Sequence, residues 1–132
     1  MLEKKLIARS NKAEYHYDHE NQIFYKIYMD MITLEDIVRS WEYVFRENLI
    51  PPGTRGFVLD YRNAELRMHP GESHGINEFY DRHLDVFRNR KIGLIMEKPD
   101  QVIFPMLVAA ERPMYYPRAF CTKEAAEEWV LG

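Results

Sequence analysis

Residues 55–76 read RGFVLDYRNAELRMHPGESHGI, which combines a short apolar run, a polar segment and the start of a helical pattern. The run GFVLDYR, residues 56–62, does not alternate with polar residues, and this is typical of a strand covered on both faces. In α/β domains the junction between such a strand and the next helix usually carries the functional residues. We therefore expect residues 62–76 to form a recognition loop and a helix start.

The sequence before this junction predicts antiparallel strands. Residues 4–9 have the composition of a short strand, and apolar residues alternate with polar ones in residues 13–18 and again in residues 22–31. Period-two alternation is typical of a half-buried strand. In the last segment it places Tyr25 on one face and Lys26 on the other. Turn-forming residues separate the segments, so we expect a hairpin or meander.

Four segments have helical periodicity. Thr33 and Asp36 resemble a capping box, after which apolar residues recur at three- and four-residue steps. The predicted helices cover residues 34–48, residues 76–90, residues 100–112 ended by Pro113, and a short segment after the N-cap candidate Thr122. Pro105 falls inside the third pattern, so that helix should begin late or kink.

Apolar runs at residues 91–97, KIGLIME, and residues 116–121, YPRAFC, predict two more strands. Strands that alternate with helices require crossover connections and a mostly parallel sheet. The predicted fold class is α/β, with a mixed, mostly parallel sheet, an N-terminal antiparallel hairpin and about four helices in one domain, residues 1–132. The helices should cover one face mainly, or both faces unequally.

Composition limits the partners and the compartment. The chain of 132 residues has a formal net charge of −3 and a pI of about 6.0, so we expect no nucleic-acid partner. No apolar run approaches the roughly 18 residues of a membrane span, so we expect no membrane insertion. The N-terminus has no apolar signal-peptide core, and Cys121 is the only cysteine. A lone cysteine suits a reducing compartment, and we expect a cytoplasmic protein.

Motifs for nucleotides, metals and catalysis are absent or poorly spaced. Gly53 and Gly56 precede the central strand instead of following it, so they cannot form a phosphate loop. His69, His74 and His83 do not share one helical face, so we expect no metal and no cofactor.

Two further residues are candidates for a catalytic or binding role. Cys121 with one of the histidines would be a nucleophile, but an inert buried cysteine is commoner. Asp60 lies in an apolar strand and needs a partner such as Arg62 or Tyr61, and a structural role is favoured. No nucleophile–base pair emerges, so we expect no enzyme.

Ser73 is the sharpest candidate for a functional residue. It lies near a predicted helix start, where free N–H groups and the helix dipole stabilise a phosphate. It is therefore a candidate phosphoacceptor. The alternative, which we favour, is a helix cap, or a first-turn residue if Pro70 is the first helical position.

Six tyrosines give a second hint of a partner. Exposed aromatic residues beside an edge strand are typical of an interface such as a homodimer, whereas strand preference alone also enriches aromatic residues. Both interpretations stay open. The six are Tyr15, Tyr17, Tyr25, Tyr28, Tyr115 and Tyr116.

Residues 22–131 resemble the STAS-like fold of bacterial anti-sigma-factor antagonists, the SpoIIAA-like superfamily. The resemblance rests on the strand that ends in Asp60-Tyr61-Arg62, on the strand KIGLIME, and on the tail AFCTKEAAEEWVL. In that tail the residues that correspond to the family ending are Phe120, Thr122, Glu124, Ala125, Ala126, Trp129 and Val130. We expect a stand-alone, uncharacterised bacterial member.

The resemblance implies a site at the second helix. Signalling members carry Asp-Ser-Ser/Thr-Gly there, and a partner kinase phosphorylates the first serine. Here Ser73 matches that serine and Gly75 matches the glycine, whereas Glu72 replaces the aspartate and His74 the second hydroxyl residue.

The resemblance and the residues together lead to a functional expectation. We expect a non-enzymatic regulatory or protein-interaction domain that forms a homodimer. Its recognition loop would contact the partner through Asp60, Arg62, Glu72, His74 and Gly75. The alternative is a module for a small apolar ligand or lipid, although the same residues suit a plain core. Its lining would come from Trp41, Phe79, Phe87, Met96, Phe104 and Met106.

Overall fold

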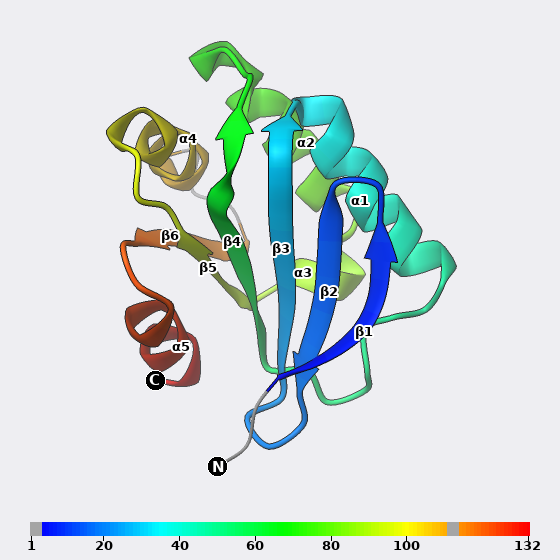
Figure 1. The fold of residues 1–132 in the computed structure, drawn as a ribbon. Coiled ribbons are helices and arrows are strands. Elements are labelled where there is room, and N and C mark those ends of the chain that lie inside the picture. The colour runs from blue at the N-terminus through cyan, green and yellow to red at the C-terminus, as the bar shows by residue number, and fades with distance from the viewer. Residues whose placement is uncertain (1–3, 111–113) are drawn as a thin grey trace.

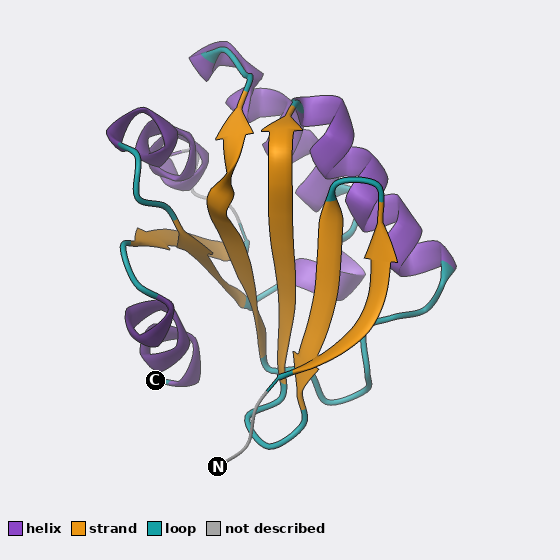
Figure 2. Cartoon of the chain, viewed as in Figure 1, coloured by secondary structure: helices purple, strands orange, loops and turns teal. Residues whose placement is uncertain are grey.

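The computed structural model describes residues 4–110 and 114–132 of the chain. Four α-helices lie on one face of a six-stranded sheet and one α-helix lies on the other (Figures 1 and 2). The strands are β1 (Lys5–Ser10), β2 (Ala13–Asp18), β3 (Ile23–Ile32), β4 (Gly56–Leu66), β5 (Lys91–Ile95) and β6 (Tyr116–Phe120). The helices are α1 (Leu34–Arg46), the 3₁₀ helix η1 (Pro70–Glu72), α2 (Ser73–Asp81), α3 (Leu84–Phe87), α4 (Pro99–Ala110) and α5 (Lys123–Leu131).

The strands lie in the sheet in the order in which they occur in the chain. β1, β2 and β3 pair antiparallel, and β3 to β6 pair parallel. Each parallel connection carries helix, as a crossover requires. The predicted α/β class, the mixed sheet and the N-terminal antiparallel hairpin are therefore confirmed.

Local sequence explains where α1 and α5 begin. The Thr33 hydroxyl accepts from the N–H of Asp36 at 3.2 Å, and the Asp36 carboxylate accepts from the N–H of Thr33 at 2.9 Å. This reciprocal pair satisfies two N–H groups that otherwise lack a partner. Thr122 caps α5 in the same way, because its hydroxyl accepts from the N–H of Ala125.

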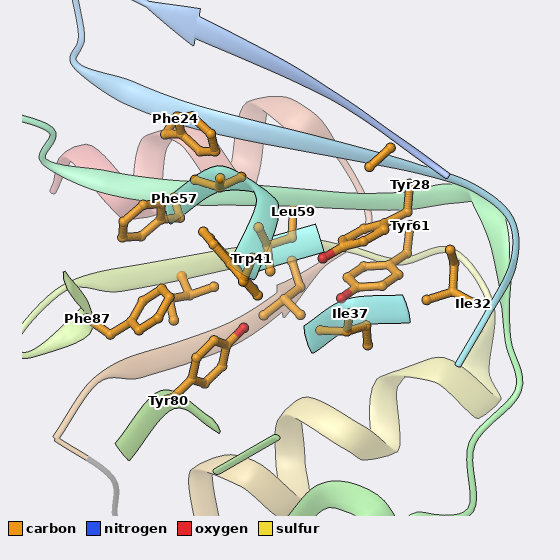
Figure 3. Close-up of a cluster of buried hydrophobic side chains, with 14 of the residues drawn as sticks. Phe24, Tyr28, Ile32, Ile37, Trp41, Phe57, Leu59, Tyr61, Tyr80 and Phe87 are labelled. Carbon is orange, nitrogen blue, oxygen red and sulfur yellow. The ribbon is translucent and has the colours of Figure 1, made fainter. Parts of the chain in front are cut away.

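The main core lies between the sheet and helices α1 to α4. Figure 3 shows Trp41 at its centre. The Trp41 ring packs edge-on against Phe57 and Phe87, with centroids 5.5 and 4.9 Å apart. Each aromatic pair of this kind adds about 0.5–1.5 kcal/mol beyond the area that it buries. Aromatic packing therefore dominates this side of the sheet.

A smaller core lies under α5 on the opposite face. It joins Ile23, Tyr25, Val58 and Ile95 of the sheet to Ala126 and Val130 of α5. The helix approaches closely because Gly56 has no side chain. A Cβ at that position would lie 2.6 Å from Cγ1 of Val130, which is too close for van der Waals contact.

Three boundaries differ from the sequence prediction. β4 continues to Leu66, so residues 63–66 of the predicted loop are strand. The predicted second helix is divided into α2 and α3, so the described residues form five α-helices instead of about four. The described part of α4 begins at Pro99 and continues through Pro105, so the predicted late start is wrong. The predicted end of that helix, at residues 111–113, lies outside the described residues.

Candidate functional site

Ser73 is the first residue of α2 and follows η1 directly. Its backbone N–H donates to the carbonyl of Pro70, and its side chain is buried, with 5% of its surface exposed. Pro70 is the first residue of η1. Ser73 therefore lies in the first turn after a proline start, and phosphorylation of its hydroxyl requires this turn to open.

The residues next to Ser73, namely Glu72, His74 and Gly75, each have different surroundings. The Glu72 carboxylate accepts from the backbone N–H of His69 at 2.9 Å and closes the η1 turn, while the side chain of His74 is exposed. A Cβ on Gly75 would lie 2.5 Å from Cδ2 of Leu34, so this glycine lets α2 pack closely against α1. The packing of α2 against α1 therefore explains why a glycine occupies this position of the motif.

Asp60 and Arg62 lie elsewhere, on the α5 face of the sheet. The Arg62 guanidinium donates to both carboxylate oxygens of Asp60, at 3.0 and 2.8 Å, and the Arg62 N–H donates to the same carboxylate. The hydrogen bonds that Arg62 donates to Asp60 and the charges of Asp60, Glu97 and Glu124 raise the pKa of Arg62. The pair satisfies a carboxylate that is only 7% exposed, as its structural interpretation predicted.

A β-bulge interrupts β4 at the Asp60–Arg62 pair. Ile27 pairs with Asp60 but Met29 pairs with Asn63, so two residues of β4 oppose one residue of β3. The predicted recognition residues therefore form two groups. One is the Asp60–Arg62 pair in the middle of a strand, and the other is the start of α2 beyond the end of that strand.

A buried lysine is the feature that sequence reasoning missed. Lys26 of β3 has no exposed surface, and its side-chain nitrogen Nζ donates to Oγ of Ser40 at 2.6 Å. Nζ lies 3.7 Å from the centroid of the Trp41 ring and 4.8 Å from that of Tyr28. Burial lowers the pKa of Lys26 well below 10.5, because the charged form loses its hydration.

Ser40 joins this lysine to Tyr28. The Ser40 hydroxyl donates to the carbonyl of Ile37 at 2.7 Å, and it lies 3.1 Å from the hydroxyl of Tyr28. Burial and nearby tyrosines raise the pKa of Tyr28 well above 10. Alternation places Lys26 and Tyr28 on the same face of β3. A lysine in such a strand normally indicates the face that contacts water, but here Ser40 and Trp41 of α1 cover that face.

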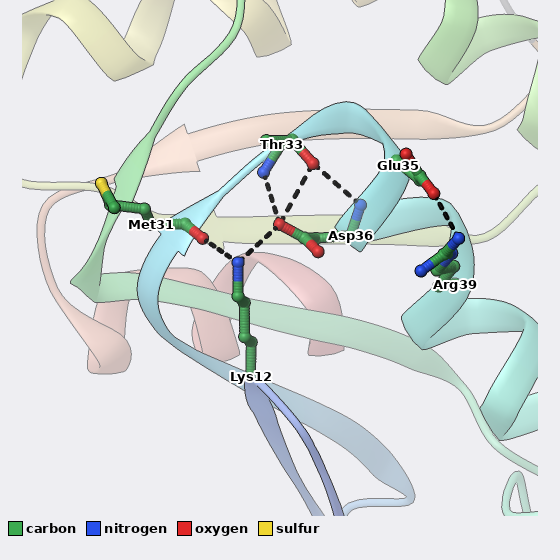
Figure 4. A network of polar contacts seen from close by, with 6 residues as sticks. All are labelled: Lys12, Met31, Thr33, Glu35, Asp36 and Arg39. Carbon is green, nitrogen blue, oxygen red and sulfur yellow. Dashed lines mark hydrogen bonds and ion pairs between the residues drawn. The ribbon is translucent and has the colours of Figure 1, made fainter.

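A polar cleft adjoins this cluster, between the β1–β2 turn and α1. Its volume is about 150 Å³. Figure 4 shows Lys12 reaching from the turn to Asp36, with Arg39 one turn further along α1. The Lys12 ammonium donates to Asp36 at 3.0 Å and to the carbonyl of Met31 at 2.8 Å. Partial burial alone would raise the pKa of Asp36, but hydrogen bonds from Thr33 and Lys12 lower it.

An apolar cavity lies between β4, β5, α2 and α4. Its volume is about 30 Å³, which is room for about one water molecule. Met96 and Phe104 line it, as the ligand hypothesis predicted. Trp41, Phe79 and Phe87 are instead part of the solid core, and Met106 points away, with 66% of its surface exposed.

Most of the tyrosines are buried, contrary to the interpretation as an exposed surface. Tyr15, Tyr17, Tyr25, Tyr28 and Tyr115 are at most 2% exposed, and only Tyr116 of the six is exposed. The reason is that helices and neighbouring strands cover the tyrosine side chains on both faces of the hairpin. Tyr25, for example, donates to the Glu127 carboxylate of α5.

The remaining candidates stay apart from one another. Cys121 is exposed, so the expectation of a buried cysteine is wrong. Across residues 4–110 and 114–132, no three His, Cys, Asp or Glu side chains gather as a metal would require. In the same part of the chain, no helix has the length and apolar character needed to cross a membrane.

Comparison with known proteins gives a likeness in structure alone. No family model matches the chain, and no curated protein matches it. A solved structure that resembles it is an uncharacterized protein of the DUF3478 family with a SpoIIAA-like fold, from Shewanella loihica PV-4. The superposition has a TM-score of 0.55 at 13% identity and covers 98% of this chain and 93% of that one. This chain therefore has a SpoIIAA-like fold.

Proposed function

We propose that the chain is a non-enzymatic regulatory domain that recognises a partner protein through residues 63–74. We call this segment the recognition ridge. It runs from the end of β4 through η1 to the first turn of α2, beyond the carboxyl ends of the parallel strands, where α/β folds commonly bind their ligands.

The single observation that carries this proposal is the exposure of an ordered segment. The exposed residues of the ridge are Asn63, Glu65, Arg67, His69, Pro70, Gly71 and His74. The segment is held by the hydrogen bond from the His69 N–H to Glu72 and by the bond from the Arg67 N–H to the carbonyl of Ile32. An ordered surface loses little entropy when it binds, so it suits recognition.

An apolar side chain lies beside the ridge. Met31 of β3 pairs with Glu65 across the sheet, and 48% of its surface is exposed. Methionine is flexible and polarizable, and it adapts to varied partner surfaces. Glu65 and Arg67 form an exposed ion pair at 3.5 Å, which contributes little to folding and is available to a partner of either charge.

Site-specific crosslinking tests this proposal. A photoreactive benzoylphenylalanine at position 69 should capture one partner protein from cells of the source organism, identified by mass spectrometry. The same residue at position 42, which is exposed on α1, is the matched control. Capture at both positions, or at neither, contradicts the proposal. Capture of a second copy of this chain would show that the partner is another molecule of the same protein, in a homodimer.

A second candidate function is the binding of a small apolar ligand in the cavity between α2 and α4. The observation that favours it is the apolar lining, which includes the flexible side chains of Met68 and Met96. Pro105 within α4 lacks the N–H of a helical hydrogen bond, so this helix beside the cavity has one backbone bond fewer to hold it. Native mass spectrometry of the purified protein should then show a co-purifying apolar molecule, and the bare mass of 15.9 kDa alone contradicts this candidate.

A further inference from the structure

The polar cleft between the β1–β2 turn and α1 has the size and lining of a small-molecule site. The residues that line it are Ser10, Asn11, Lys12, Ala13, Tyr28, Ile32, Asp36, Arg39 and Ser40. Its volume of about 150 Å³ equals that of about five water molecules, since each takes about 30 Å³ in the liquid. A phosphate ion or a short dicarboxylate fits within this volume. None of the residues that line the cleft belongs to the recognition ridge, residues 63–74.

Two buried hydroxyls line the cleft. Tyr28 is 1% exposed and Ser40 is 7% exposed, and their oxygens lie 3.1 Å apart. The buried Lys26 amine donates to the Ser40 oxygen from the core side. Because that oxygen already accepts a hydrogen, the Ser40 proton can turn from the carbonyl of Ile37 to an anion in the cleft. Hydroxyl donors fixed in this way suit an oxyanion acceptor.

Cations outnumber anions in the lining. Lys12 and Arg39 carry two positive charges, against the single negative charge of Asp36. The negative charge of Asp36 is already stabilised by two donors, since Thr33 and Lys12 both donate to its Oδ2 atom. Arg39 pairs with Glu35 at the surface, with 71% of its side chain exposed, so it can turn to a ligand at little loss.

We propose that this cleft binds a small oxyanion, either a phosphate or a short carboxylate. Tyr28 and Ser40 would donate to it from the floor, and Arg39 and Lys12 would balance its charge from the rim. This inference does not depend on the proposed function, because neither the ridge nor a protein partner enters it.

Calorimetric titration with inorganic phosphate and with malonate tests the proposal. At least one of these probes should bind one site with a Kd below about 1 mM. Arg39→Gln should weaken binding by about tenfold or more, because it removes a charge-assisted hydrogen bond. Arg46→Gln is the matched control, since Arg46 lies exposed on the last turn of the same helix and is absent from the cleft.

Ser40→Ala should weaken binding by a similar factor and tests the floor of the cleft. Arg39 is at the surface, so its variant keeps the proposal falsifiable even if Ser40→Ala fails to fold. Three results overturn the proposal: no binding of either probe, binding that Arg39→Gln leaves unchanged, or equal binding of uncharged glycerol at the same concentration.

Discussion

The buried Lys26 gives up a proton when the chain folds, and this makes the free energy of unfolding depend on pH. Lys26→Met should remove that contribution. Burial places the folded-state pKa of Lys26 well below 10.5, so the wild-type amine is neutral in the fold above that lower pKa, whereas the unfolded chain still binds its proton up to about pH 10.5. The unfolded state therefore holds one more proton between these two values. In that window the free energy of unfolding rises with pH, by about 1.4 kcal/mol per pH unit.

The magnitude follows from the burial of this one group. Methionine has a similar length, keeps the contact with the Trp41 ring and leaves Ser40 its bonds to Tyr28 and Ile37. The variant should be more stable than wild type at pH 7. Between the folded-state pKa and about pH 10.5 its advantage should shrink by about 1.4 kcal/mol for each pH unit, and it should be constant below the folded-state pKa.

Urea unfolding followed by tryptophan fluorescence measures this difference, because Trp41 is fully buried in the fold. Wild type and variant are compared at several values between about pH 7 and about pH 9, where tyrosine ionisation contributes little. Lys5→Met, which removes an exposed lysine of β1, controls for the loss of one cation. A stability difference between Lys26→Met and wild type that does not change with pH would refute the reasoning, since Lys26 would then be charged in the fold.

Three further substitutions test the packing and the candidate site. Asp60→Asn should lower the free energy of unfolding by about 1–3 kcal/mol in urea titrations, because it weakens the bidentate pair with Arg62, and an unchanged value would contradict that role. Gly56→Ala should cost about 1–3 kcal/mol because its Cβ meets α5, whereas Gly71→Ala, where nothing lies within 4 Å, should be near neutral, and equal effects would refute this. Ser73→Ala should abolish any single phosphorylation by a kinase of the source organism, and no phosphate on the wild-type protein would end the switch hypothesis.

The element order could be predicted because periodicity is a local signal. Alternation in residues 13–18 and 22–31 gave the antiparallel hairpin, and the later change between strand and helix patterns gave the parallel crossovers. The extension of β4 also had a signal. Asn63 and Glu65 are exposed and alternate with Ala64 and Leu66, so the polar residues resembled a loop although they form a half-buried strand.

The break between α2 and α3 had no local signal. No proline or glycine lies at residues 82–83, and the helical stripe continues across them. The structure places the His83 ring against Phe45 and Phe79, with centroids 4.7 and 4.6 Å away. Contacts between distant segments thus accompany the end of α2, and sequence periodicity cannot report them.

The candidate site was predicted only in part for a related reason. Ser73, Glu72, His74 and Gly75 do lie together at the start of α2, but Asp60 and Arg62 belong to the opposite face of the sheet. The burial of Lys26 depends on α1, which places Ser40 and Trp41 over it. A lysine in an alternating strand gives no sign that a helix will cover it.

The affinity of the reconstituted complex tests the recognition ridge most directly. Once crosslinking at position 69 has identified the partner, the dissociation constant is measured with the purified proteins. Met31→Asp should raise it at least about tenfold, because the exposed apolar side chain beside the ridge becomes a charge. Glu42→Gln, on the exposed side of α1, should leave it unchanged. Equal affinity of wild type and Met31→Asp would contradict recognition at this surface.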